Sequence, residues 1–165
     1  MKQTLAFNGL DEPALVSLAL RMAPALAAGG VVFLAGNLGA GKTTFARALL
    51  GALGVEARIK SPTYSLIESY EVGGLTIHHL DLYRIADAGE LEWLGLADLA
   101  VEPYLLLVEW PERGRGALPP PDLTVSLAHA PAARDVVLEA STPRAAAWLH
   151  DLRSTGQSAA SRAST

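Results

Sequence analysis

The segment GNLGAGKT, at residues 36–43, constrains the fold of this chain more than any other part of the sequence. It fits the pattern G-x-x-x-x-G-K-[ST], in which glycines allow successive backbone N–H groups to curl around phosphate oxygens. The apolar residues 31–35 precede it and indicate a buried parallel strand, and a stretch with helical periodicity follows it to about Gly54. Strand, glycine loop and helix in this order predict a P-loop that binds a nucleotide triphosphate.

Two side chains at the end of this loop have the chemistry that such a site needs. Lys42 can reach the β- and γ-phosphates, and the Thr43 hydroxyl can bind Mg²⁺. The alternative is a glycine-rich turn without a ligand, but the glycines, Lys42, Thr43 and both flanking elements agree on a nucleotide site. The motif does not reveal what the nucleotide is used for.

Length and composition suit a single folded domain. Half of the 165 residues are hydrophobic, so we expect one P-loop domain over residues 1–153 with a substantial core. Residues 154–165 are rich in serine, alanine, threonine and glycine, and we expect them to be disordered. The chain has no cysteine, which excludes disulfides and thiolate metal sites.

The charge and hydropathy of the chain limit which partners and which cell compartment we expect. The formal net charge of −4 argues against broad electrostatic binding to nucleic acid or to an anionic membrane. No apolar run approaches the roughly 20 residues that a bilayer-spanning helix needs, and the first residues lack a signal-peptide core. We therefore expect a cytoplasmic protein that does not enter a membrane.

Periodicity and turn residues predict the remaining elements. Asp11 is a good N-cap for a helix that ends near Leu26, and Gly73-Gly74 is a good hairpin turn. The other expected elements are a hairpin of residues 64–72 and 75–83, short helical turns at 87–94 and 95–100, a strand at 104–109, a hairpin of 122–130 and 134–140, and a helix at 143–152. The predicted fold class is therefore α/β: a P-loop NTPase whose mixed central sheet combines a parallel core with antiparallel hairpins and is flanked by helices.

Two acids stand near the ends of predicted strands. Four aliphatic residues lead into Glu109, as in a Walker B strand, and α/β proteins bind ligands at the carboxyl ends of such strands. Glu109 can hold Mg²⁺ or orient an attacking water; the alternative is an acidic strand end before a helix that starts at Pro111. Asp81 lies in an apolar setting and needs a partner or a metal. His78 and His79 project to opposite faces of their strand, so they cannot chelate a metal together.

Of three further positions, the first two each allow two interpretations. The loop KSPTY, at residues 60–64, includes Thr63 and can sense a γ-phosphate as switch loops do, or can simply form a polar turn. Arg134, near a hairpin turn, is either a surface charge or a side chain that reaches the nucleotide. Glu12, taken by itself, is an ordinary acid in the first turn of a helix.

Four motifs together resemble one family closely. GNLGAGKTTFARALL, SPTYSLIESY, HHLDLYRI and LLLVEWPERG occur in the same order and with similar spacing as in the TsaE family, formerly YjeE. The similarity extends over residues from about 5 to 150, and the last three motifs are not general P-loop signals. Asn37 departs from the aspartate of many members, and the tail beyond Leu152 has no clear counterpart.

The resemblance implies a compact P-loop ATPase that binds ATP and Mg²⁺ and hydrolyses ATP slowly on its own. It also implies that the proteins TsaD and TsaB are partners, which modify adenosine 37 of tRNAs reading ANN codons, so that tRNA is met only through that complex. The implied catalytic residues are Lys42, Asp81 and Glu109, and the implied metal ligands are Thr43 and Glu109. The implied nucleotide contacts are Glu12, Gly39, Ala40, Gly41, Lys42, Thr43, Thr44, Thr63, Asp81 and Arg134, with Trp110 beside the site.

Other classes of P-loop protein fit less well. A small-molecule kinase is the main alternative, but the only lid-like stretch with arginines, residues 112–116, is short. A GTPase would carry an N-K-x-D motif that reads guanine, and the sequence has none. A binding module in which ATP only sets the conformation is a further alternative.

Overall fold

A computed structural model describes residues 2–56 and 66–163, with side chains as far as Ser154. Its centre is one sheet of seven strands in the order β1-β7-β6-β2-β5-β4-β3. The strands are β1 (Gln3–Leu10), β2 (Gly30–Ala35), β3 (Ile67–Val72), β4 (Leu75–Asp81), β5 (Tyr104–Glu109), β6 (Leu123–Ala130) and β7 (Ala133–Ala140).

The sheet has a parallel centre and antiparallel flanks. β2 runs parallel to both β5 and β6, and β4 runs parallel to β5. The hairpins β3–β4 and β6–β7 are antiparallel, and β1 adds to β7 in the antiparallel sense. Gly73 and Gly74, both with positive φ, form the tight turn between β3 and β4, where left-handed backbone matches the twist of the strands. The predicted mixed α/β fold is confirmed.

Three helices, α1, α2 and α4 (Pro143–Ala163), cover one face of the sheet and close the larger core. α1 (Glu12–Leu26) begins as predicted at Asp11, whose carboxylate accepts the Ala14 N–H at 2.9 Å. α2 (Lys42–Leu53) follows the P-loop and ends at Gly54, which has the left-handed φ of +106° that favours glycine. Phe45 of α2 and Leu34 of β2 are fully buried in the core between these helices and the sheet.

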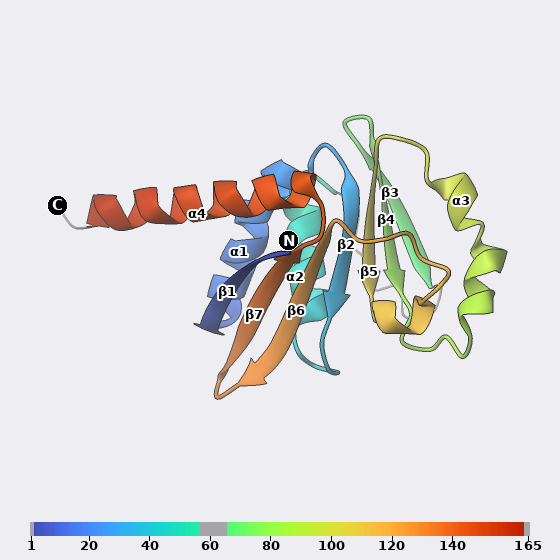
Figure 1. Ribbon diagram of the computed structural model, residues 1–165, viewed down its shortest axis with the longest axis horizontal. Coiled ribbons are helices and arrows are strands. Elements are labelled where there is room, and N and C mark those ends of the chain that lie inside the picture. Colours follow the sequence, from blue (N-terminus) through green and yellow to red (C-terminus); the bar gives the residue numbers. More distant parts are fainter. Residues whose placement is uncertain (1, 57–65, 164–165) are drawn as a thin grey trace.

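Shorter elements cover the opposite face. They are the 3-10 helix η1 (Ala88–Leu94), the helix α3 (Leu96–Leu99) and the 3-10 helix η2 (Pro111–Gly114). Leu91 of η1 packs with Leu82, Leu106 and Val108 in a second, smaller core on this side of the sheet. Figure 1 shows α3 on the side of β5 and β4 that lies away from α1 and α2.

Strand β1 was not predicted from the sequence. It pairs with β7 from Gln3 opposite Ala140 to Phe7 opposite Val136, and the register then shifts before Leu10. Leu5 and Phe7, partly buried against the larger core, alternate with exposed residues, and this is the strand signal that the sequence prediction overlooked. Its position depends on a partner near the other end of the chain.

The last helix is longer than predicted. α4 (Pro143–Ala163) continues through the residues for which we expected disorder from Ser154 onward. The segment has no proline after Pro143 and is rich in residues that tolerate helical backbone, alanine above all, so nothing in it ends the helix near Leu152. In Figure 1 the C-terminal turns of α4 extend beyond the rest of the molecule.

Arginines attach α4 to the N-terminal part of the chain. Arg144 Nη2 donates to the carbonyl of Gly29 at 2.7 Å, and Arg153 Nη2 donates to the carbonyl of Thr4 at 2.6 Å. In return, Arg21 Nη2 of α1 donates to the carbonyl of Leu152 at 2.8 Å. Within the ranges that the structure describes, no helix has both the length and the apolar character needed to cross a membrane.

Candidate active site

The site lies at the carboxyl ends of three neighbouring parallel strands. The P-loop leaves the end of β2, Glu109 ends β5, and Asp81 ends β4. In the sheet Glu109 is the register partner of both Leu34 and Asp81, so both acids lie on the edge from which the P-loop departs. A cleft of about 450 Å³ opens there, and its lining includes Lys42, Thr43 and both acids.

The path of the P-loop requires glycine. A Cβ on Gly36 would lie 2.4 Å from the Leu127 carbonyl oxygen, closer than any side chain can approach, and its φ is +149°. Gly39 and Gly41 also have positive φ, and Gly41 is the N-cap of α2. Among the described residues no side chain caps this helix, which leaves N–H groups of its first turn for an anion. Ala40 is fully buried, and its N–H donates to the Asn37 carbonyl at 3.0 Å.

Lys42 is held inside the loop. Its Nζ donates to the carbonyls of Gly36 and, at 2.9 Å, of Asn37, and lies 4.2 Å from the centre of the Trp110 ring. Only 5 % of the residue is exposed. Burial lowers the pKa of the Lys42 amine, and the negative charges of Glu109 and other nearby acids oppose that effect. The ammonium is thus in the cleft, where phosphate oxygens can replace its two carbonyl partners.

Glu109 is fixed from two sides. Its Oε1 accepts the Thr43 hydroxyl at 3.2 Å, and its Oε2 accepts from Nε2 of His79 at 2.7 Å. Glu109 is 2 % exposed and His79 is 1 % exposed. The contact with His79 was missed by sequence reasoning, although a strand places residues i and i+2 on one face and so puts His79 beside Asp81.

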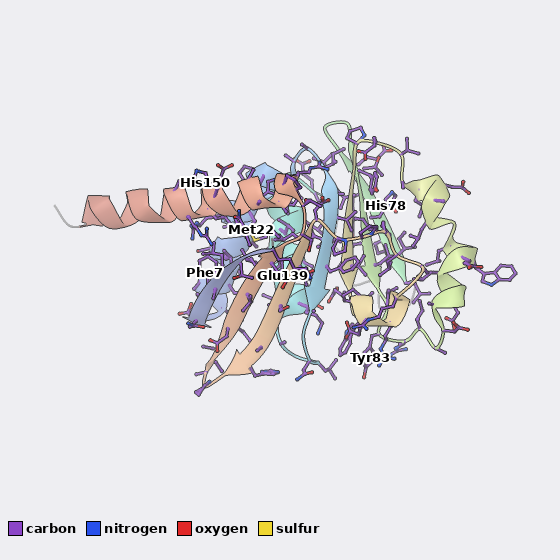
Figure 2. All side chains as sticks on the ribbon, in the orientation of Figure 1. Phe7, Met22, His78, Tyr83, Glu139 and His150 are labelled. Carbon is purple, nitrogen blue, oxygen red and sulfur yellow. The ribbon has the colours of Figure 1, made fainter. Side chains whose placement is uncertain are left out.

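Asp81 is the second acid of the cleft. Burial raises the pKa of its carboxyl, the backbone N–H of Tyr83 opposes that effect through a 3.0 Å hydrogen bond, and nearby Glu109 raises it further. His78 points to the other face of β4, as expected, where its ring nitrogens lie 2.8 Å from Ser69 Oγ and 3.0 Å from the Leu99 carbonyl. Figure 2 shows His78 on the α3 side of the molecule.

The Tyr83 and Trp110 rings form one wall of the cleft, and Arg113 lies beside them. The Tyr83 and Trp110 rings are 5.0 Å apart, and the Arg113 guanidinium lies 5.4 Å from the Tyr83 ring centre. Figure 2 shows Tyr83 below η2, which carries Arg113. Trp110 has a left-handed backbone with φ of +59°, unusual for a residue other than glycine, and this turn directs its ring over Lys42.

A second cavity adjoins the cleft and shares Gly41, Thr44 and Arg134 with it. It has a volume of about 320 Å³, and its lining also includes Glu12 and Leu15. Arg134 Nη2 donates to the carbonyl of Gly39 at 3.1 Å, so this side chain reaches the P-loop rather than only the surface.

The structure therefore brings together nine of the ten residues expected to contact nucleotide. Eight of them line the cleft or the second cavity, and Ala40 lies in the loop between them. The tenth, Thr63, lies outside the described residues, as does the rest of the predicted switch-like loop at 60–64.

Comparison with known proteins identifies the family. The family model described as threonylcarbamoyl adenosine biosynthesis protein TsaE matches residues 10–136, which is most of the chain. The chain belongs to the TsaE family. This confirms the resemblance seen in the sequence motifs, and the family carries the name of tRNA threonylcarbamoyladenosine biosynthesis.

Individual TsaE proteins and a solved structure are similar over much of their length. The tRNA threonylcarbamoyladenosine biosynthesis protein TsaE of Haemophilus influenzae is 45% identical over 112 residues, 68% of this chain and 71% of the relative. That of Bacillus subtilis is 38% identical over 102 residues, 62% of this chain and 63% of the relative. The crystal structure of Bacillus subtilis YdiB superposes with a TM-score of 0.76 at 27% identity, covering 94% of this chain and 98% of that one.

The donor set in this TsaE-family cleft fits a hard divalent cation. Within the described residues, no group of three or more His, Cys, Asp or Glu side chains could hold a metal ion. Mg²⁺ at nucleotide sites usually takes one or two protein oxygens and completes its shell with phosphate and water. The Thr43 hydroxyl and the Glu109 carboxylate are two such oxygens, 3.2 Å apart at the lining of the cleft.

Proposed function

We propose that the protein is a Mg²⁺-dependent ATPase that serves tRNA threonylcarbamoyladenosine biosynthesis together with the proteins TsaD and TsaB. The observation that carries this proposal is the convergence of the P-loop with two strand-end acids. Thr43 Oγ1 lies 3.2 Å from Glu109 Oε1, and Asp81 is the strand partner of Glu109. A glycine loop alone suffices to bind phosphate, whereas acids at its open side are what metal binding and hydrolysis require.

Phosphate binding follows from the loop and from Lys42. The N–H groups at the start of α2 would donate to phosphate oxygens, and Lys42 would exchange its carbonyl partners for the β- and γ-phosphates. Because burial lowers the pKa of Lys42, a polyanion beside it would favour the charged form of the amine. The second cavity, with Glu12 and Arg134, would take the nucleoside.

Glu109 and Asp81 would have different roles in metal binding and hydrolysis. Thr43 and Glu109 would hold Mg²⁺, which when bound neutralises phosphate charge and orients the phosphates. Asp81 lines the same cleft, and burial raises the pKa of its carboxyl. A higher pKa makes this carboxylate a stronger base toward a proton of the attacking water.

The contacts of Lys42 and Arg134 are the basis on which we expect ATP hydrolysis to depend on partner proteins. Lys42 would already be used to bind the phosphates of the ground state, and Arg134 donates to the carbonyl of Gly39, so this pair leaves a role for a further cation that stabilises the charge developing on the γ-phosphate. A cation supplied in trans accelerates hydrolysis at P-loop sites by roughly 10³–10⁵-fold. We therefore expect slow turnover by the protein alone and a large stimulation by TsaD and TsaB.

The small-molecule kinase alternative is weaker. It required residues 112–116 to act as a lid, but η2 (Pro111–Gly114) is a helical turn whose Pro111 and Gly114 are buried. The Arg113 guanidinium lies 5.4 Å from the centre of the Tyr83 ring and 5.7 Å from that of Trp110. The lining of the cleft includes Tyr83 and Trp110 but no residue of 112–116, so this segment lies behind the wall and does not face the cleft.

The decisive experiment measures ATP turnover with and without TsaD and TsaB. Stimulation by the partners, lost in Lys42→Ala, is the expected result. Lys2→Ala is the matched control, because Lys2 is an exposed lysine that pairs with Glu139 at 3.2 Å, outside the lining of both cavities. Unchanged turnover in Lys42→Ala would refute the proposal, and transfer of phosphate to a metabolite would favour the kinase.

A further inference from the structure

His79 stands out because it is buried beside the candidate site but does not line the cleft. The side chain is 1 % exposed and comes from β4, whereas Glu109 comes from β5. Its Nε2 lies 2.7 Å from Glu109 Oε2, the shortest contact that this carboxylate makes among the described residues. His79 can therefore act on the chemistry only through Glu109.

The chemistry of the pair fixes which atom donates. An ionised carboxylate only accepts hydrogen bonds, so His79 must carry its proton on Nε2. Within the described part of the chain, Nδ1 of His79 is buried and has no hydrogen-bond partner. A lone pair at Nδ1 is tolerated there more readily than a second N–H, which would be a buried donor without an acceptor.

The contact determines how the carboxylate is turned. The terminal torsion of a glutamate is broad, so a buried carboxylate rotates unless both oxygens have partners. His79 holds Oε2 on the sheet side, and this leaves Oε1 for the Thr43 hydroxyl, 3.2 Å away. Three elements, β4, β5 and α2, thus meet at a single carboxylate.

We propose that His79 is a positioning residue that holds Glu109 so that Oε1 faces Thr43 and the metal-binding end of the cleft. This inference rests on the proposed function, because there Glu109 holds Mg²⁺ with Thr43. Groups that orient a metal ligand in this way typically change metal affinity or activity about 10- to 100-fold when they are removed.

Three variants separate the hydrogen bond from the bulk of the ring. His79→Gln places an amide N–H near the position of Nε2, and His79→Asn places it near the position of Nδ1. His79→Leu keeps apolar volume and removes the donor. The matched control is His78→Leu, since His78 is the neighbouring buried histidine but bonds Ser69 and Leu99 on the opposite face.

The main readout is the gain in affinity that Mg²⁺ gives to the non-hydrolysable analogue AMPPNP. Calorimetric titration in Mg²⁺ and in EDTA yields this ratio, and ATP turnover and thermal melts accompany it. We expect His79→Leu and His79→Asn to lose about 10- to 100-fold of the Mg²⁺ effect while affinity in EDTA is kept. His79→Gln should recover most of it, and His78→Leu should keep it even where it lowers the melting temperature.

Two results overturn the inference. One is an equal Mg²⁺ effect in His79→Leu, His78→Leu and wild type; the other is the failure of all three His79 variants to fold, which would show a purely structural role. If only His79→Leu fails to fold, the Mg²⁺ effects on AMPPNP affinity in His79→Gln and His79→Asn are compared instead. Equal Mg²⁺ effects in these two variants would refute the positioning role. If Mg²⁺ does not change the affinity of the wild-type protein for AMPPNP, the proposed function and this inference are both refuted. If Mg²⁺ raises that affinity equally in wild type and in His79→Leu, only the positioning role of His79 is refuted.

Discussion

Replacing Glu109 by alanine should weaken the fold and abolish turnover, whereas replacing it by glutamine should abolish turnover alone. Alanine leaves the Nε2–H of His79 without an acceptor in a site where the histidine is 1 % exposed. Glutamine keeps a carbonyl oxygen that can accept that N–H and occupies nearly the same volume. Both variants remove the charged oxygen that the proposed metal site needs.

The magnitude follows from the lost acceptor. A buried donor left unsatisfied costs about 1–3 kcal/mol. For domains of roughly 150–250 residues, each kcal/mol shifts the melting temperature by about 2–4 °C. The alanine variant should therefore melt roughly 2–12 °C below the glutamine variant. Because both changes remove the same buried negative charge, that difference isolates the hydrogen bond and the volume.

Thermal melts and ATP turnover together test this reasoning. Turnover should fall by about 10²–10⁴-fold in both variants if Glu109 acts on the attacking water or the metal. Glu71→Ala, which removes an exposed acid of β3 outside the lining of the cleft, is the control and should change neither quantity strongly. Equal melting temperatures for the alanine and glutamine variants would refute the role given to His79, and an active glutamine variant would refute the role given to Glu109.

Three further predictions test the loop, the second acid and the core. Gly36→Ala should destabilise by about 1–3 kcal/mol and weaken nucleotide binding, because its Cβ would lie 2.4 Å from the Leu127 carbonyl; Gly51→Ala, with nothing within 4 Å, is the control in denaturation and binding assays, and equal effects would contradict this. Burial raises the pKa of Asp81 in the folded state above its ordinary value of 3.8, so ionised Asp81 lowers the stability of the fold at a pH above its folded-state pKa. Asp81→Asn should therefore raise the melting temperature at about pH 7.5, and the gain should shrink as the pH falls toward 3.8. A gain that does not change with pH would contradict the raised pKa. Phe45→Ala should cost about 3–5 kcal/mol in urea unfolding because the ring is fully buried, and a cost below about 1 kcal/mol would show that the core collapses around the gap.

Much of the fold was predictable because its signals are local. The P-loop, α1 with its Asp11 cap and the β3–β4 hairpin with Gly73-Gly74 all follow from residues close together in the chain. The cluster of Lys42, Thr43 and Glu109 was also foreseen, since parallel strands in an α/β sheet end on one edge.

What sequence reasoning missed depends on contacts between distant segments. The contact of His79 with Glu109 requires that β4 and β5 be neighbours in a defined register, and the order of strands cannot be read from one sequence. The second cavity likewise joins Glu12 at the start of α1 to Arg134 at the start of β7; the resemblance pointed to both residues, and the position of Arg134 near a turn left two interpretations open. The length of α4 was misjudged because composition alone does not distinguish a helix-tolerant tail from a disordered one.

The place of β1 in the sheet has a consequence for synthesis on the ribosome. Among the described strands β1 pairs with β7 alone, so Gln3 must wait for Ala140 before its edge of the sheet can form. Nascent chains halted before β7 therefore carry an unpaired N-terminal segment ahead of a P-loop unit that can already collapse. Completion of this edge is a late event, because it waits for the last strand of the sheet to be synthesised.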